Sequence, residues 1–270
     1  MPNYTAADVK RLREETDAPM MECKTALDES GGDFDRAKEI LREKGKLAAA
    51  KRQDRTTSEG VVAFSANAAG NVLAGVVIEC ETDFVARNEE FIELAQKIAD
   101  LVRDTGATSG DDPKIKELIE GAVAKIRENI RLAKAVLLNG EGRYLTYVHH
   151  DKSKGAAVQV QGADNDEAVR KVAIQIVAFP PEVLKKEDLS QEKIQKEIET
   201  EIQRAINEGK DPKIAENIAK GRVNKEFIKE VVLLEQPFYA DASRSVGDYL
   251  KENAKGSSIS EFVYLAVGKA

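Results

Sequence analysis

The sequence has no tryptophan, and aromatic residues make up only 5% of its 270 positions. Each phenylalanine or tyrosine outside a core pattern therefore carries extra weight as a candidate contact residue. The two cysteines, Cys23 and Cys80, are too few for a disulfide framework, and their spacing is not that of zinc ligands. Both lie in apolar patterns, which predicts two buried thiols.

Long apolar runs and an excess of positive charge are also missing. No stretch approaches the roughly 20 apolar residues that a membrane helix needs, so we expect no membrane association. Residues 1–5 lack the basic and apolar regions of a secretion signal, which predicts a cytoplasmic protein. The net charge is −7, whereas a binder of phosphate backbones has a clustered basic excess, so we expect no nucleic-acid partner.

Catalytic and cofactor motifs are absent from the sequence. It has no phosphate-binding loop, no nucleophile elbow and no metal-ligand spacing, so we expect no enzymatic activity, no cofactor and no metal. Its two histidines, His149 and His150, are adjacent. Neighbouring side chains on an extended chain point to opposite faces, so we expect the two rings not to chelate one ion easily and to lie in a polar loop.

What is present predicts a globular α+β protein of several domains. The chain is too long for one small module, and 42% of its residues are hydrophobic. Residues 1–54 predict a three-helix domain with its linker, in which Thr5 and Asp8 form a capping box. The expected core positions are Val9, Leu12, Met20, Cys23, Ala26, Leu27, Phe34, Ala37, Ile40 and Leu41.

The core is predicted to contain two related subdomains of antiparallel sheet and helix. The first spans residues 55–140, and the second is divided between 141–180 and 230–270. A strand-turn-strand-helix-strand order occurs twice, which suggests two units packed side by side. The predicted elements are strands at 61–65 and 72–78, helices beginning near Phe91 and Pro113, strands at 132–138, 143–148 and 155–161, a helix through Val169 and Val177, and strands at 230–234 and 262–267, the last at an edge.

Residues 181–229 predict an insertion within the second subdomain. Pro180 and Pro181 end the preceding helix, and Ser190 caps a new one. Two apolar stripes joined by the turn 209–212 predict an antiparallel helical hairpin that projects from the core. The stripes are Ile194, Ile198, Ile202 and Ile206 on the first helix and Ile214, Ile218 and Phe227 on the return.

Two short segments carry candidate contact residues. Thr82, Asp83, Phe84 and Val85 form a polar turn between a strand and a helix, where rigid elements on both sides hold one aromatic ring. The ring can face a partner, or Asp83 can be a helix N-cap beside a core ring, and the spacing alone leaves both open. The second segment is a methionine pair: Met20 continues a buried stripe, so its neighbour Met21 is expected to be exposed.

The segment Thr82–Val85 resembles the Thr-Asp-Phe-Val signature of the bacterial elongation factor Ts family, and the resemblance extends from about Thr5 to Val267. The N-terminal helices resemble the family's UBA-like (ubiquitin-associated-type) domain, although Asp17 and Pro19 replace the two glycines of its Thr-Gly-Ala-Gly-Met-Met turn. The insertion resembles the family's coiled-coil hairpin. The segment Tyr147-Val148-His149 matches the family's Tyr-x-His pattern, in which His150 has no counterpart.

This resemblance implies a guanine-nucleotide exchange factor that binds elongation factor Tu, both GDP-bound and nucleotide-free, and promotes GDP release. It implies that Thr82–Val85 enters the partner near the magnesium of its G domain, and that Met20, Met21 and His149 are further contacts. Self-association in the complex stays open. Two other classes are alternatives: an adaptor for ubiquitin-like or helical partners, which would leave Phe84 buried, and an enzyme with an unrecognised site.

Overall fold

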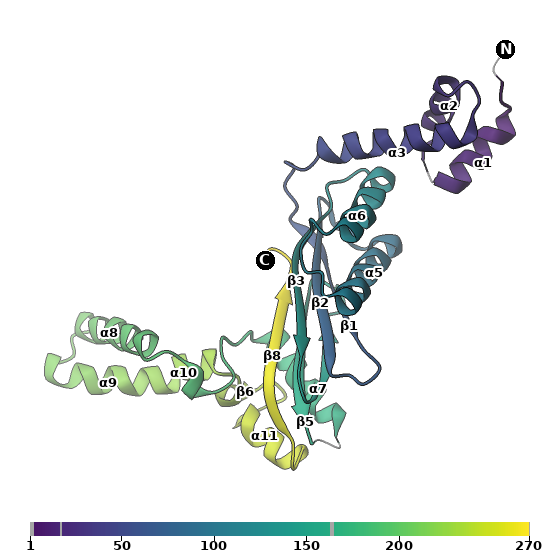
Figure 1. The fold of residues 1–270 in the computed structure, drawn as a ribbon. Coiled ribbons are helices and arrows are strands. Elements are labelled where there is room, and N and C mark those ends of the chain that lie inside the picture. The colour runs from purple at the N-terminus through teal and green to yellow at the C-terminus, as the bar shows by residue number, and fades with distance from the viewer. Residues whose placement is uncertain (1–2, 17, 163–164, 270) are drawn as a thin grey trace.

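The computed structural model describes residues 3–16, 18–162 and 165–269 (Figure 1). Its N-terminal part is a three-helix unit with a core of its own. The capping box is confirmed, because the Thr5 N–H donates to the Asp8 carboxylate at 2.8 Å and the Asp8 N–H donates to the Thr5 hydroxyl at 3.3 Å. The turn residue Asp17 lies outside the described residues. The helices are α1 (Ala6–Thr16), α2 (Met20–Glu29) and α3 (Phe34–Ala50).

A three-stranded antiparallel sheet in the order β1-β2-β3 follows, and two helices lie along one side of it (Figure 1). Phe91 and Ile98 of the covering helix are fully buried, as its apolar stripe predicted. Gly106 ends that helix with φ 76°, a left-handed conformation that favours glycine. The elements are β1 (Glu59–Ala66), β2 (Val72–Cys80), α5 (Glu89–Thr105), α6 (Pro113–Ile126) and β3 (Arg131–Asn139).

A second antiparallel sheet has the order β4-β5-β8, so the last strand lies at an edge as predicted. Its core is built with two helices, and Val158, Val172, Ile176 and Leu250 are among its buried residues. The elements are β4 (Arg143–Val148), β5 (Lys154–Gln161), α7 (Asp166–Ala178), α11 (Val246–Asn253) and β8 (Ser258–Ala266).

The prediction of a strand at residues 230–234 is wrong. This stretch contains the end of helix α10 (Phe227–Val231) and the start of a 3₁₀ turn, Leu233–Glu235, with one parallel bridge between Val183 and Val232. A short apolar run is consistent with either a buried strand or a buried helical turn. The third strand of the second sheet is β8 instead, which closes the unit from the far end of the chain.

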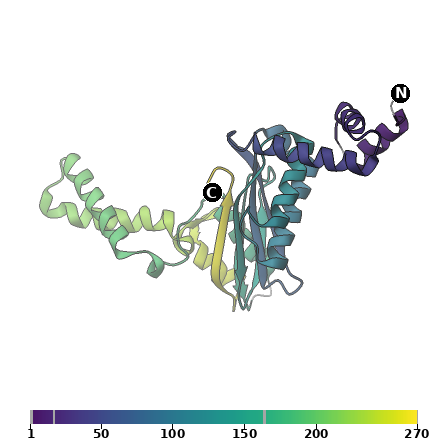
Figure 2. The same ribbon diagram turned by 45° about the horizontal axis from the view of Figure 1, so that its top comes forward.

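The two sheets pack face to face, and Figure 2 shows the strands between two groups of helices. Val62 and Val77 from the first sheet share a buried cluster with Leu265 from the second. Gly75 makes room for the ring of Phe64, because a Cβ at this glycine would lie 2.8 Å from a ring carbon. The antiparallel α+β architecture is thus a layer of helices, two sheets and a second layer of helices.

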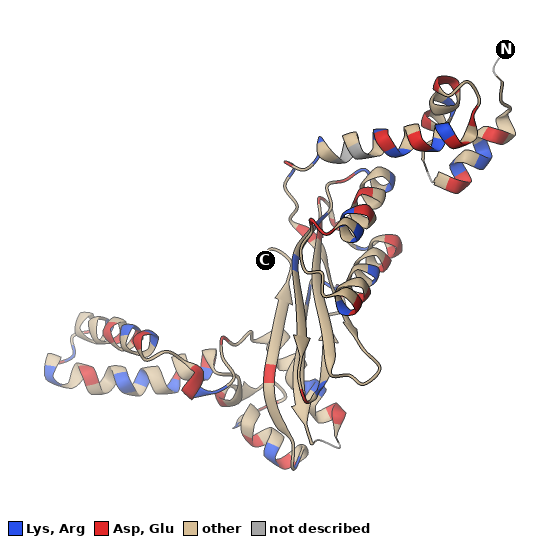
Figure 3. Cartoon of the chain, in the orientation of Figure 1, with Lys and Arg blue, Asp and Glu red and all other residues tan. Residues whose placement is uncertain are grey.

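A helical hairpin projects from the second sheet (Figure 1), and its helices carry many charged residues (Figure 3). Ser190 caps α8 as predicted, since its hydroxyl accepts from the Lys193 N–H at 3.2 Å. Ile214 does not belong to the seam and is half exposed, because the buried face of α9 is made by Ala215, Ala219 and Val223. The remaining elements are a 3₁₀ turn (Lys186–Asp188), α8 (Gln191–Asn207), α9 (Pro212–Lys225), β6 (Pro237–Phe238) and β7 (Asp241–Ser245).

None of the described helices is long and apolar enough to cross a membrane.

Candidate partner-binding end of the sheets

The turn after β2 exposes the ring of Phe84. Thr82 is the N-cap of a single helical turn, α4 (Asp83–Ala86), and its hydroxyl accepts from the Val85 N–H at 3.4 Å. Val85 packs against the first core and Ala86 is buried, whereas Phe84 is 83% exposed. The alternative with a core ring and an Asp83 cap is therefore wrong. Asp83 forms an ion pair with Arg87 at 3.1 Å, which closes the turn on its outer side.

The side chain of Glu128 fixes this turn through hydrogen bonds. One carboxylate oxygen accepts from the backbone N–H groups of Glu81 at 3.0 Å and Thr82 at 3.1 Å, and the other accepts from the Thr82 hydroxyl at 2.6 Å. Hydrogen bonds to a charged group are stronger than neutral ones. No local pattern in the sequence points to Glu128, because it lies 46 positions from Thr82, the turn residue that it binds.

Replacing Glu128 with alanine is expected to loosen the Thr82–Val85 turn and to cost about 1–3 kcal/mol of stability, since three donors lose their acceptor. Glu128→Gln is the matched control, because glutamine has nearly the same size as glutamate and its amide oxygen can still accept a hydrogen bond from the turn. Amide hydrogen exchange at residues 81–85 measures the effect. Protection should fall in the order wild type, Gln variant, Ala variant. Equal protection in all three proteins would contradict the role given to Glu128.

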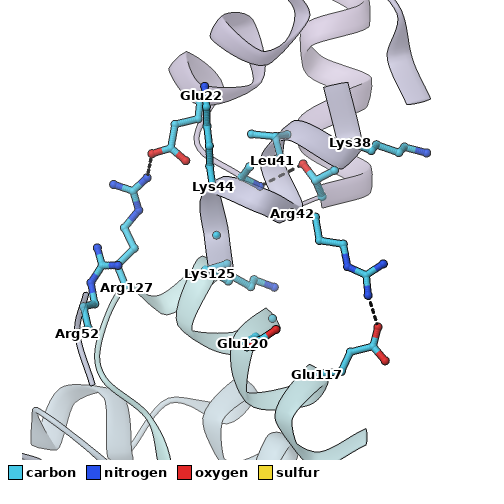
Figure 4. A pocket seen from close by; sticks show the side chains of 15 residues that line it. Glu22, Lys38, Leu41, Arg42, Lys44, Arg52, Glu117, Glu120, Lys125 and Arg127 are labelled. Carbon is cyan, nitrogen blue, oxygen red and sulfur yellow. Dashed lines mark hydrogen bonds and ion pairs between the residues drawn. The ribbon is translucent and has the colours of Figure 1, made fainter. Parts of the chain in front are cut away.

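The N-terminal helices dock on α6 beside this turn. Arg127 forms an ion pair with Glu22 of α2, and Arg42 of α3 pairs with Glu117 of α6 at 2.8 Å (Figure 4). The contact is close, because a Cβ at Gly45 of α3 would lie 3.0 Å from the Cβ of Ala124. These charges line a cleft of about 480 Å³ between the two units. Since Arg42 and Arg127 pair with carboxylates across the cleft, we interpret it as a domain contact.

One three-residue segment, 127–129, connects the N-terminal helices, the linker and the exposed turn. Arg127 faces Glu22, and Glu128 holds Thr82, as described above. The side chain of Asn129 donates to the carbonyl oxygens of Gln53 at 3.2 Å and Arg55 at 2.7 Å in the linker. The orientation of the N-terminal unit is thereby tied to the same segment that fixes the Phe84 turn.

The methionine pair lies at the start of α2, next to the docking residue Glu22. Met21 is 69% exposed, as predicted. Met20 is 49% exposed, so its assignment to the core is wrong. It is the first residue of α2 and stands outside the cluster formed by the three helices, to which Cys23 belongs. Both thioethers are therefore accessible on one corner of the N-terminal unit.

His149 begins the turn between β4 and β5. The carbonyl of Lys152 in this turn accepts from the Val62 N–H of β1 at 2.7 Å. About 10 Å of strand separates Val62 from Glu59, which pairs with Cys80 just before the Phe84 turn. The structure thus places His149 and Thr82–Val85 toward the same end of β1.

The two cysteines offer no reactive thiol at this end of the molecule. Burial raises the pKa of Cys80 to about 12 and also raises the pKa of Cys23. Both thiols are therefore protonated near neutral pH, and they pack in the cores as the sequence predicted.

The family model described as Elongation factor TS matches residues 81–269, which is most of the chain. This chain belongs to the elongation factor Ts family. An elongation factor Ts of Azoarcus sp. (strain BH72) is 40% identical over 277 residues, covering 100% of this chain and 92% of the relative. Those of Corynebacterium aurimucosum and Aquifex aeolicus are 40% and 38% identical, covering 99% and 97% of this chain and 100% and 97% of the relatives.

Membership of the elongation factor Ts family places the chain in translation elongation, a stage of protein biosynthesis. Thr82–Val85, Glu128 and His149 fall within the matched residues. Met20 and Met21 precede them and lie in the part that only the full-length relatives cover.

Proposed function

We propose that this chain is a guanine-nucleotide exchange factor that binds elongation factor Tu and promotes GDP release. The proposal rests on the exposure of Phe84. This large apolar side chain is 83% exposed, and Glu128 fixes the turn that carries it through hydrogen bonds. An adaptor that used the core only as a scaffold would keep this ring buried. Membership of the elongation factor Ts family supplies the partner.

In this proposal the Thr82–Val85 turn enters the G domain near the bound magnesium. The Phe84 ring inserts between two helices of the G domain. Thr82 and Val85 maintain the conformation of the turn, and Asp83 stabilises the turn. GDP and this protein then weaken each other's binding by the same factor, and a coupling of about 3 kcal/mol corresponds to roughly a hundredfold. The protein binds both the GDP-bound and the nucleotide-free partner and makes no covalent bond.

The other contacts form a second part of the proposal. Met20 and Met21 contact the partner from a UBA-like N-terminal domain, since methionine side chains adapt to irregular surfaces. His149 contacts the partner from the second sheet. The projecting helices act as a coiled-coil hairpin that reaches a distant part of the partner or a second copy of this chain. All of this takes place in the cytoplasm, where translation elongation occurs.

Release of labelled GDP from elongation factor Tu tests the proposed function. A substoichiometric amount of this protein should accelerate release, because each molecule acts repeatedly. Excess magnesium should reduce the acceleration, since the proposed step displaces that ion. The proposal fails if the rate of release is the same with and without this protein.

Deleting residues 1–54 is expected to weaken binding to elongation factor Tu but to leave a folded core. Both sheets and their covering helices lie outside the deleted segment, so a cooperative thermal transition should remain. Titration calorimetry with the nucleotide-free partner measures the affinity. Glu39→Ala is the control, because it keeps the domain and removes one exposed ion pair within α3, a change of at most about 1 kcal/mol. Unchanged affinity after the deletion would contradict a docking role.

A further inference from the structure

The turn between β4 and β5 brings three donor side chains together. His149, His150 and Asp151 each offer one ligand atom, and these atoms all lie within 4.8 Å of one another. The ring centroids of the two histidines are 4.2 Å apart. The expectation that adjacent rings diverge is therefore wrong, since the rule for extended chains does not hold in a turn. We propose that His149, His150 and Asp151 form a binding site for Zn²⁺ or a similar transition-metal dication.

The donor set and its spacing suit such an ion. Zn–N bonds of about 2.0 Å place tetrahedral donors roughly 3.3 Å apart, so modest side-chain rotation closes the site. The pair His149 Nδ1 and Asp151 Oδ1 is already 2.9 Å apart. Two imidazoles and a carboxylate favour zinc, nickel or copper, whereas magnesium and calcium prefer oxygen ligands. His150 and Asp151 are exposed, so water can complete the coordination.

The backbone of this turn is already fixed to both sheets. Besides the bond from Val62 to the Lys152 carbonyl, the Val267 N–H donates to the Ser153 carbonyl at 2.9 Å. Asp151 Oδ1 accepts from the Ser153 N–H at 2.9 Å and from its hydroxyl at 2.8 Å. Partners of this kind orient a ligating carboxylate. Metal binding therefore needs little ordering of backbone, which lowers its entropic cost.

Few other histidine or cysteine side chains in this chain could compete with this turn for zinc. His149 and His150 are its two histidines, and Cys23 and Cys80 are both buried. An imidazole signal that responds to zinc consequently reports on this turn.

Zinc binding is tested by following the imidazole NMR signals of the full chain during titration with Zn²⁺. One equivalent should shift both rings, and Mg²⁺ at the same concentration should shift neither. His150→Ala removes one donor and should lower the affinity about tenfold or more, as loss of even an outer-shell partner does. Lys152→Arg, a change of a non-ligand in the same turn, should bind like wild type. Unshifted rings, or a His150→Ala variant that binds as tightly as wild type, would overturn the site.

A consequence for activity rests on the proposed function. A metal ion on His149 occupies a ring proposed to contact elongation factor Tu, so Zn²⁺ should slow GDP release by wild type. His150 has no role in the proposed exchange, and His150→Ala should be active and resistant to zinc. Equal inhibition of both proteins would overturn this consequence. If wild type fails to accelerate release even with a zinc-selective chelator, the proposed function fails, while the titration still decides the metal site.

Discussion

Phe84→Ala is expected to slow GDP release from elongation factor Tu by about 30-fold or more, with almost no change in melting temperature. A central aromatic contact contributes about 2 kcal/mol or more at an interface. The ring is 83% exposed, so its truncation leaves no cavity in the folded protein. Stopped-flow release of a fluorescent GDP analogue and thermal unfolding, measured on the same preparation, separate the two effects.

Phe91→Ala is the matched control for this change. Its ring lies seven positions along the chain and is fully buried in the first core. Truncation there should cost about 3–5 kcal/mol of folding stability and should affect exchange only through unfolding. If Phe84→Ala melts as early as Phe91→Ala, the ring is structural. If it is stable and exchanges like wild type, Phe84 has no part in the mechanism.

The elements with strong local signals could be predicted from the sequence. The capping box at Thr5, the cap at Ser190 and a strand over most of residues 262–267 are where the residue patterns place them. Each of these patterns depends only on residues that are close in the sequence, so it does not depend on how distant parts of the chain fold. Segment 230–234 shows the limit, because a short apolar run is buried equally well as a strand or as a helical turn.

The candidate site was only partly predictable, since its geometry depends on distant residues. Spacing alone left the direction of Phe84 open. The direction follows from Thr82, whose hydroxyl accepts from the Val85 N–H and donates to Glu128 in the loop between α6 and β3. The His149 turn also has a distant partner, because the carbonyl of Lys152 accepts a hydrogen bond from the Val62 N–H of β1. Pairings between distant strands leave no local trace in the sequence.

The hairpin insertion is expected to be removable in its outer part but not as a whole. Its root, the Leu189 cluster, consists of Leu189, Val223, Ile228, Val231 and Val232, with Ile194 and Ile198 packed against it. Replacing residues 199–221 with a short glycine-serine linker removes the outer seam and leaves this cluster intact. The melting temperature should then stay within a few degrees of wild type.

Replacing the larger segment 182–228 should destabilise the second subdomain severely. It removes Leu184, a buried member of the second sheet's core, and Ile228 of the root. It also removes the Val183 carbonyl, which accepts from the Leu233 N–H at 2.9 Å. Losing Leu184 and Ile228 alone costs at least about 4 kcal/mol, which corresponds to a fall on the order of 10 °C in melting temperature.

Calorimetry of the two excisions decides where the core ends. Equal melting temperatures would show that the whole predicted insertion, 181–229, is an appendage. A large difference would show that residues within 182–198 and 222–228 belong to the core of the second subdomain. The shorter excision is then the protein in which to test the hairpin's contact with elongation factor Tu, since weaker binding by a fully folded core reflects lost contact and not lost structure.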